Sequence, residues 1–487
     1  MTQENLLYQD DLGNLNEERI MQFIQHHHDQ QVPRLEKLDR YYRGDNVAIT
    51  DASSRRVEKG KADYRAKHSF AKYIADFQTA YSVGNPVTVK TIDNDDRLDH
   101  ITNANDTDSL NYDLFLDMTR YGRAYEYIYM GQDDVEHSVR LDPLDTFVIY
   151  SLNVDPTPIM AVRYHKIEVI DGKDKNIKYI PETFTATEHV TYQPTAIGSV
   201  MEPESKEPLQ VFPVIEYKNN QFRLGDYENV LTLIDLYDAA QSDTANYMTD
   251  LNDALLVIQG DIDALLNNAG FGGINPEDTK SAQDLAESKM QMIEEMKDAN
   301  MLLLRSGISS SGNQTSVDAK YINKEYDVNG TEAYKKRLAS DIHKFSHTPD
   351  LTDEKFSSNI SGIAMKYKLL GTVEMAAIKR RMFEKGLYER YSIIASLESK
   401  ASTQFKTNVA DISFTFTDNL PENDIEIIQT LQKAGATLPQ EYLYQYLPGV
   451  TDPSQITDML KKQGGDGYDD TTGNNPYGQE LGGSDNN

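Results

Sequence analysis

Residues 225–253 hold seven carboxylates and no lysine or arginine: Asp226, Glu228, Asp235, Asp238, Asp243, Asp250 and Asp253. Two carboxylates that share a site can act as general acid and base, and a larger group of them repels phosphate. Because the chain contains 78 acidic residues, carboxylate pairs are expected by chance. The pairs Asp133–Asp134 and Asp469–Asp470 lie in expected loop or tail segments. The carboxylates alone therefore do not predict a catalytic pair.

A long helix is needed to position the acidic stretch. Its apolar residues recur at helical spacing, and no proline interrupts them: Leu231, Ile234, Ala240, Met248, Leu251 and Leu255. A helix whose polar face has one sign of charge cannot use ion pairs between successive turns, so packing of its apolar side must hold it. One interpretation is a solvated surface helix of an acidic protein. The other is a helix repeated around a ring, with its carboxylates facing a water-filled bore.

Sequence motifs typical of enzymes are missing. The chain has no G-x-x-x-x-G-K-[ST] phosphate loop, no H-E-x-x-H, no G-x-S-x-G, and no G-x-G-x-x-G after a strand. It has no cysteine, which excludes zinc–thiolate sites and cysteine nucleophiles. The adjacent His26, His27 and His28 would point in three directions on a helix, so we do not expect them to share a metal ion. We expect no enzyme activity, cofactor or metal.

Length and composition favour a divided, acidic subunit. A chain of 487 residues exceeds what one core usually organises, so two to four subdomains are expected. The formal charge of −30 argues against ordinary nucleic-acid binding, but it is compatible with a channel that passes DNA without holding it. The N-terminus does not resemble a signal peptide, and no apolar run approaches membrane-spanning length. We therefore expect an intracellular or particle-bound protein without membrane contact.

Periodicity and turn residues divide the chain into helices and strands. Asn16 is expected to cap one helix, and a second begins after Pro33 and stops at Gly44. Further helices are expected at 68–83, 109–120, 331–348 and 362–397, with short ones between 421 and 462. Strands are expected at 124–130, 139–141, 146–150, 160–166, 183–192, 214–217, 255–258, 301–305, 317–325 and 411–417. The order predicts a mixed α+β fold.

Three segments, in consistent order, resemble one protein family. The segment PVIEYKNNQFRLGDYENVLTLIDLYDAAQSDTANYMTDLNDALLVIQG resembles the stem-helix region of portal proteins of long-tailed double-stranded DNA bacteriophages. The segment DIHKFSHTPDLTDEKFSSNISGIAMKYKLLG is similar to the tunnel loop of that family and the helix after it. LEKLDRYYRGDN and HSFAKYIADFQTAYSVGNPVTV resemble its N-terminal portion. The resemblance covers roughly residues 15–460.

The resemblance implies the portal architecture, an α+β subunit that forms a ring. The expected parts are a flexible N-terminal arm (1–14), an α+β wing (15–219), a stem helix (220–256), an α/β clip (257–328), a second stem helix (329–348), a tunnel loop (349–361), a kinked tunnel helix with a wing strand (362–420), a helical crown (421–463) and a disordered tail (464–487).

The resemblance also implies a function. Twelve subunits would surround a channel at one capsid vertex, through which genomic DNA is packaged and later ejected. The expected partners are the terminase large subunit, head–tail connectors, the major capsid and scaffolding proteins, and double-stranded DNA that passes without tight binding. The protein would be assembled in the bacterial cytoplasm and remain in the virion. Another head–tail adaptor ring, or an acid-dependent intracellular hydrolase, stays as an alternative.

Site residues follow from aligning these parts with the sequence. The expected channel-facing stem carboxylates are Asp235, Asp238, Asp243 and Asp250, some of which could instead pair with the basic segment 362–400 of a neighbouring subunit. The expected tunnel-loop residues are Lys355, Phe356 and Asn359, with Lys355 as the cation for phosphate contact. Gly371 is a candidate hinge, although close packing would equally explain a glycine there. The adaptable clip loop is expected to bind partners through Ser309, Ser310 and Asn313.

Overall fold

The computed structural model has mixed helix and strand content, which confirms the predicted α+β class. It describes residues 7–51, 61, 63–91, 96–171, 174–250, 255–260, 290, 291, 294, 301–305, 318–322, 327–351, 369–401, 408–418 and 459. The expected tunnel loop, crown and tail lie wholly or mostly outside these residues, as do residues 1–6 of the expected arm; residues 7–14 of the arm are described and include a strand that pairs with 149–150. Within the described part, no helix has the length and apolar character needed to cross a membrane.

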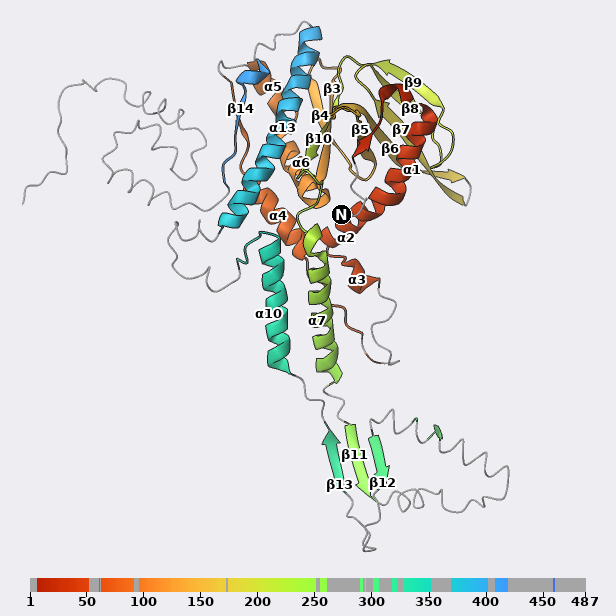
Figure 1. Ribbon diagram of the computed structural model, residues 1–487, viewed down its shortest axis with the longest axis vertical. Helices are drawn as coiled ribbons and strands as arrows, with labels where there is room; N and C mark the ends of the chain where they lie inside the picture. Colours follow the sequence, from red (N-terminus) through yellow and green to blue (C-terminus); the bar gives the residue numbers. More distant parts are fainter. Residues whose placement is uncertain are drawn as a thin grey trace, which may run out of the picture. The chain divides into compact units, whose positions relative to one another are not determined.

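A six-stranded sheet occupies one side of the upper region in Figure 1. Its order is β1 (Tyr8–Gln9), β5 (Thr146–Tyr150), β6 (Pro158–Asp171), β7 (Asp174–Phe184), β8 (Glu188–Tyr192) and β9 (Pro203–Pro208). The β1–β5 pair is parallel and the others are antiparallel. The predicted strand at 146–150 is confirmed, whereas the single strand predicted at 183–192 is wrong, because a turn separates β7 from β8.

Helix α1 (Glu17–His26) covers this sheet and runs almost continuously into α2 (Val32–Tyr42), which packs with α4 (Phe70–Val83) and α6 (Thr107–Tyr121). Helix α1 begins at Asn16, whose side chain accepts a hydrogen bond from the Arg19 N–H, as predicted for a cap. A π-helical turn, η3 (His27–Gln31), leads directly into α2. The expected break at Pro33 is therefore wrong. Proline inside an α-helix clashes with the carbonyl four residues earlier, and the wider π turn relieves that contact.

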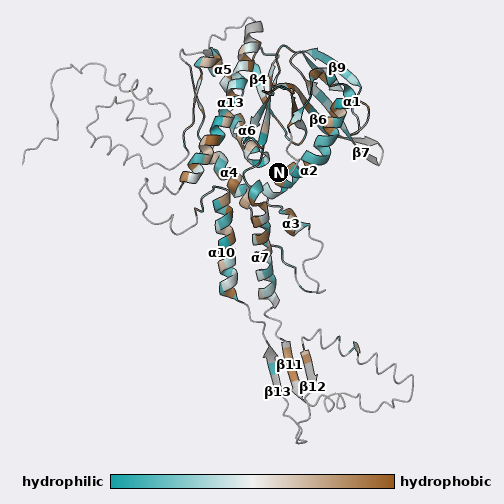
Figure 2. Ribbon diagram, viewed as in Figure 1, coloured by the Kyte–Doolittle hydropathy of each residue, from teal (hydrophilic) through white to brown (hydrophobic). Residues whose placement is uncertain are grey.

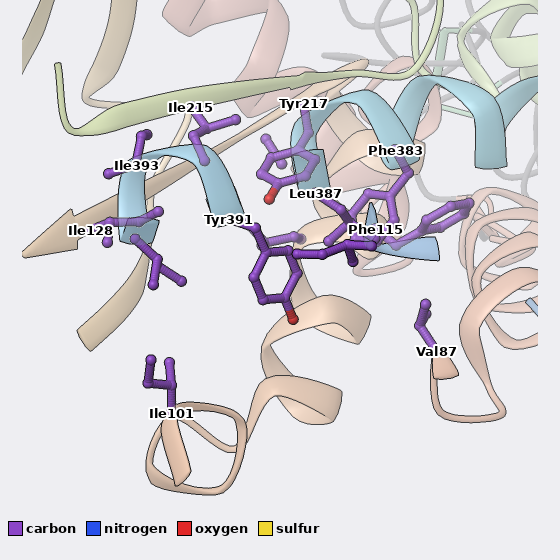
Figure 3. Close-up of a cluster of buried hydrophobic side chains, with 14 of the residues drawn as sticks. Val87, Ile101, Phe115, Ile128, Ile215, Tyr217, Phe383, Leu387, Tyr391 and Ile393 are labelled. Carbon is purple, nitrogen blue, oxygen red and sulfur yellow. The ribbon is translucent and has the colours of Figure 1, made fainter. Parts of the chain in front are cut away.

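A second layer packs helices against a three-stranded sheet. The sheet order is β10 (Val214–Lys218), β3 (Arg123–Met130) and β4 (Glu136–Leu141). The helices that share its core are α4, α5 (Asp96–Ala104), α6 and α13 (Leu370–Ala401). Figure 3 shows Phe115, Tyr217, Phe383 and Tyr391 gathered in the core between these elements. Helix α13, from the C-terminal third of the chain, is therefore an integral part of the core formed by residues before 220.

Two smaller features complete this layer. Strand β14 (Ser413–Thr415) pairs with β2 (Thr88–Lys90), which confirms a strand inside the predicted 411–417 and places it against a segment more than 300 residues earlier. Helix α6 ends at Gly122, which has a φ of +83°. A Cβ at Gly122 would lie 2.0 Å from the Arg223 carbonyl oxygen, so only glycine allows this turn to approach the 219–225 segment.

Helices α7 (Leu231–Asp250) and α10 (Val328–Phe345) lie side by side (Figure 1). A 3₁₀ turn, η4 (Glu228–Val230), precedes α7, and α3 (Val47–Thr50) packs beside it. Four apolar residues of α10 recur in the sequence at spacings of four, four and three, which predicts one buried stripe: Tyr334, Leu338, Ile342 and Phe345. Leu338 and Ile342 are buried, whereas Tyr334 and Phe345 are about half exposed (47% and 50%). Only part of the predicted stripe is therefore buried within the subunit.

A separate three-stranded sheet follows α7 in the sequence. Its order is β12 (Met301–Arg305), β11 (Leu255–Gly260) and β13 (Asp318–Ile322). Strand β11 pairs with β12 in parallel and with β13 antiparallel. Sequence also suggests that the 301–305 and 317–325 strands, which are neighbours along the chain, pair with each other; this prediction is wrong, because β11 lies between them. Figure 2 shows hydrophobic residues on β11 and β12. This hydrophobic composition is why both strands could be predicted from the sequence.

Candidate functional site at the α7–α10 helix pair

Helices α7 and α10 run antiparallel and are joined at two levels. The Asn229 side-chain amide, just before α7, donates a hydrogen bond to the Phe345 carbonyl at the end of α10 (3.0 Å). Twelve residues further along, the Gln241 amide oxygen accepts a hydrogen bond from the Lys335 ammonium (2.7 Å). The two contacts fix which residues of α7 and α10 lie at the same height. They also bury Lys335 between the helices.

Asp238 is buried in the face of α7 that meets the rest of the subunit. Its carboxylate accepts hydrogen bonds from the His68 N–H (3.0 Å) and from the Asn46 amide, and its other close partner is the His68 ring (2.8 Å). The residue has 0% exposure, so Asp238 cannot present a charge to a channel, and its assignment there is corrected. The sequence already indicated that Asp238 is buried, because it follows Ile234 by four residues and Leu231 by seven and so lies on the apolar stripe of α7.

The other three predicted stem carboxylates differ from Asp238 in exposure. Asp235 is partly buried and accepts a hydrogen bond from the Tyr41 hydroxyl; burial raises the pKa of its carboxyl, and that hydrogen bond opposes the shift. Asp243 is exposed. Asp250 is the last residue of α7, and its side chain lies outside the described part of the structure. Of the four predicted residues, Asp243 is the one whose described side chain is exposed.

A buried ion pair connects α13 to the turn that begins the α7 segment. The Lys379 ammonium bonds to the Asp226 carboxylate, and both side chains are at most 5% exposed. The other Asp226 oxygen accepts a hydrogen bond from the Asn219 amide, and its N–H donates to the Thr119 carbonyl (both 2.8 Å). Burial lowers the pKa of Lys379, and the adjacent Asp226 opposes that shift. Neither residue was predicted as a site residue, because 153 positions separate them in sequence.

A cavity of about 400 Å³ lies beside this ion pair. Its walls come from four helices or their ends: α4, the turn before α7, the end of α10, and α13. Phe345, His347, Met375 and Lys379 are among the lining residues. His347 has a φ of +52°, an uncommon left-handed conformation for a residue with a side chain. Its carbonyl accepts hydrogen bonds from the Thr372 hydroxyl (2.7 Å) and the Gln78 amide (3.2 Å), which hold the end of α10 to α13 and α4.

A second buried ion pair fixes the other half of α13. The Arg390 guanidinium contacts the Glu126 carboxylate of β3 at 2.8 Å and donates to the Asn111 amide oxygen of α6 at 2.8 Å. The same carboxylate accepts a hydrogen bond from the Tyr217 hydroxyl. Arg390 and Lys379 are thus both neutralised inside the subunit. They do not supply the positive face that was expected to meet the stem carboxylates of a neighbour.

The two glycines of α13 have different surroundings. Gly371 lies in the first turn of the described helix, and among the described residues a Cβ there would meet the His347 ring nitrogen, at 3.5 Å, and nothing closer. No described residue therefore requires a glycine at this position. Gly386 is buried, and a Cβ there would come within 2.3 Å of the Tyr217 ring. Gly386 is thus needed for the close approach of α13 to β10, and α13 continues through it as a helix.

The remaining predicted site residues lie outside the described residues. These are the tunnel-loop residues Lys355, Phe356 and Asn359 and the clip-loop residues Ser309, Ser310 and Asn313. The histidine run is described, and its three members contact three different side chains. His26, His27 and His28 contact the hydroxyls of Tyr8, Tyr164 and Tyr179, respectively.

Comparison with known proteins identifies the family of this chain. Residues 21–467 match the model of the phage portal protein family described as SPP1 Gp6-like. The chain is 23% identical over 434 residues to the portal protein of Bacillus phage SPP1, a match that covers 85% of this chain and 78% of that protein. It is 20% identical over 421 residues to the portal protein of Clostridium phage phiCD119, covering 82% and 85%, respectively. The chain that builds this helix pair therefore belongs to the SPP1 Gp6-like family of phage portal proteins.

Proposed function

We propose that this protein is the portal subunit of a bacteriophage. Copies of the chain form a ring at one vertex of the capsid, and the genome enters and leaves through its centre. The observation that carries this proposal is the family match over residues 21–467, which includes the α7–α10 pair and the α13 helix. The protein is a structural component of the virion, and the work of moving DNA belongs to a partner ATPase.

The described elements fit the portal parts as follows. The two sheet layers with α1 to α6 form the wing, α13 is the tunnel helix that packs into the wing, α7 and α10 form the stem, and the β11–β12–β13 sheet belongs to the clip. Residues 349–361 form the tunnel loop, and residues 421–463 form the crown. This assignment makes the 226–379 ion pair the link between the stem and the tunnel helix. Because the tunnel helix follows the tunnel loop in the sequence, the ion pair can transmit a displacement of that loop to the stem.

The chain carries a large negative charge, which suits the passage of DNA. A formal charge of −30 keeps phosphates from adhering to the channel wall, because like charges repel over a Debye length of roughly 8–10 Å. The tunnel-loop residues Lys355, Phe356 and Asn359 contact the passing duplex, with Lys355 as the cation. Replacing Lys355 by alanine lowers the DNA packaged per particle, with ring assembly unchanged. Unaltered packaging would remove Lys355 from the mechanism.

The clip provides the docking surface for successive partners. The terminase large subunit binds there during packaging, and head–tail connectors replace it afterwards, using the loop with Ser309, Ser310 and Asn313. The capsid and scaffolding proteins contact the wing. Binding of a purified terminase large subunit to the ring, and its loss when residues 306–316 are replaced by a glycine–serine sequence of equal length, tests this assignment.

The decisive test of the function is the mass and shape of the purified protein. Light scattering should give a particle of about twelve chains of 55.2 kDa each, and negative-stain images of the same fraction should show rings with a central hole. The measurement is repeated with scaffolding protein added, so that rings whose assembly requires nucleation by the scaffold are also detected. Monomers under all of these conditions would contradict the proposal.

A further inference from the structure

Arg123, the first residue of β3, is a buried cation without a partner among the residues that the structure describes. It is 4% exposed, and its Nε and Nη2 atoms make no hydrogen bond to the described chain. No described carboxylate forms an ion pair with it. A guanidinium keeps its charge at every ordinary pH, and a buried charge is costly unless it is paired and hydrogen-bonded. Arg123 therefore needs an acceptor from outside the described chain.

Two arginines of the same region show how this edge of a guanidinium is used. Arg223 donates from Nε and Nη2 to the two carboxylate oxygens of Glu216, at 2.6 and 3.0 Å. Arg34 donates from the same two nitrogens to Glu228, at 2.7 and 2.6 Å. Arg123 presents the same pair of donors, and this is the pair without an acceptor. The free edge therefore fits a ligand with two oxygens on one atom, such as a carboxylate or another oxyanion.

The charge around Arg123 is positive, although the chain as a whole is acidic. In the β3–β10 ladder, Arg123 is paired with Lys218, and Glu216 lies two residues before Lys218, so the three side chains share one face of the sheet. Burial opposes the ionisation of Glu216, but Arg223, Arg123 and Lys218 lower its pKa to about 2. Lys218 also interacts with Glu389. Glu216 and Glu389 thus offset Arg223 and Lys218, and Arg123 is the remaining cation.

A buried amide on the neighbouring helix faces the same place. His27, Gln31 and Arg34 follow one another at spacings of four and three residues, so they lie on one side of the η3–α2 segment. Burial and the charge of Arg123 lower the pKa of His27, which places His27 near that cation. Arg34 donates a hydrogen bond to the Arg223 carbonyl at 3.1 Å. Gln31 lies between these two residues and is 1% exposed, and neither atom of its amide has a described hydrogen-bond partner.

We propose that Arg123 and Gln31 form a binding site for a small oxyanion that carries a hydroxyl group, such as hydrogen phosphate. The guanidinium edge donates to two oxygens of the ligand, and the Gln31 amide nitrogen donates to a third. The Gln31 amide oxygen accepts a hydrogen bond from the ligand hydroxyl. Sulfate and chloride match the charge of the site, but they have no hydrogen to donate. The free acceptor on Gln31 therefore selects against both of them.

A bound oxyanion joins elements from separate parts of the chain. Arg123 belongs to β3, whereas Gln31 ends the π turn η3. The site lies within one subunit, so it is independent of ring formation and of the proposed portal function. The ligand binds the folded subunit alone, because the unfolded chain does not bring the two side chains together. It should therefore stabilise the subunit against unfolding.

Equilibrium dialysis of the full-length protein against radiolabelled inorganic phosphate, at an ionic strength held constant with chloride, tests the site. The wild type should bind about one phosphate per chain, and sulfate should compete about tenfold more weakly, as expected for one lost hydrogen bond in a charged site. Arg123→Met should abolish binding, because it removes both guanidinium donors. Arg337→Met is the matched control: its side chain is 76% exposed on α10, and the variant should bind phosphate like the wild type.

Gln31→Leu separates this site from a general attraction to positive charge. The variant keeps Arg123 but loses the amide, so phosphate should bind more weakly and lose its advantage over sulfate. Urea unfolding gives an independent readout. Phosphate at about nine times its Kd should lower the unfolding equilibrium constant of the wild type about tenfold and leave that of Arg123→Met unchanged.

Two results would overturn the site. One is a wild-type protein that binds no phosphate. The other is equal phosphate binding by the wild type, Arg123→Met and Arg337→Met. If Arg123→Met does not fold, Gln31→Leu decides: a preference for phosphate over sulfate that equals that of the wild type would overturn the proposal, and its loss would support it.

Discussion

Replacing Lys379 by methionine should strongly destabilise the subunit. Methionine retains most of the side-chain length, but it leaves the Asp226 carboxylate buried at the centre of the α4–α7–α13 junction without its cation. Breaking a buried ion pair from one side typically costs about 3–5 kcal/mol. Asp226 keeps the hydrogen bond from Asn219, which favours the lower part of that range.

The double variant separates the ion pair from simple packing. Asp226→Leu together with Lys379→Met replaces both charges by apolar groups, so its cost should be well below the sum of the two single changes, with a coupling of about 1–3 kcal/mol or more. Urea unfolding can be followed by circular dichroism or tyrosine emission, since the chain has 30 tyrosines and no tryptophan. Measurements belong at concentrations where light scattering shows monomers, because assembly adds its own stability.

Lys385 on the same helix provides the control. Its side chain is exposed, so Lys385→Met should change the unfolding free energy by no more than about 0.5 kcal/mol. If Lys379→Met costs as little as this control, or if the effects of the single changes simply add in the double variant, the ion pair does not hold α13 to the stem, and the reasoning fails.

Three further predictions concern backbone fit and pH. Gly386→Ala should cost about 1–3 kcal/mol because its Cβ would overlap the buried Tyr217 ring, whereas Gly371→Ala, with room at 3.5 Å, should be neutral or slightly stabilising; equal effects in denaturant unfolding would refute the close-packing role. His347→Gly should stabilise the subunit by roughly 0.5–1 kcal/mol by removing the left-handed strain, which a rise in the urea midpoint would reveal and a fall would contradict. Burial lowers the pKa of His27 well below 6.5, so the unfolded chain binds the proton first and stability should fall as pH drops below about 6.5, by up to about 1.4 kcal/mol per pH unit. His27→Gln should remove that part of the slope between pH 7.5 and 5.5, and an unchanged slope would exclude His27 as its source.

Local patterns in the sequence predict the regular elements of this fold well. Strand β5 and helix α4 carry strong apolar and aromatic signals bounded by turn residues, and both form where expected. Strand β7 was missed because its polar sequence, DKNIKYIPETF, pairs mainly with β6 in a long hairpin. The strand is held by backbone pairing, which leaves little trace in side-chain hydropathy.

The buried charges were the harder part of the site. The pairing of Lys379 with Asp226 joins positions 153 residues apart, and no local pattern distinguishes either from a solvated surface charge. Composition led us to treat both the stem carboxylates and the basic residues of α13 as exposed partners. Asp238 shows the limit of that reasoning, because helical spacing already placed it on the buried stripe, and its charge was given more weight than its position.

The π turn between α1 and α2 accommodates one residue more than an ordinary α-helix needs at this point. Five residues, His27–Gln31, occupy the widened turn, and the Val32 N–H bonds to the His27 carbonyl five positions back. Because a π turn fits its extra residue into nearly the same rotation and rise, deleting one residue here would give an ordinary α-helix and leave the residues after it facing as they do now. Leu35 and Leu38 would then stay buried in the core with Tyr227. Related chains that keep this core should therefore tolerate the loss of one residue in the turn, whereas a single deletion inside α2 would rotate the residues after it by about 100°.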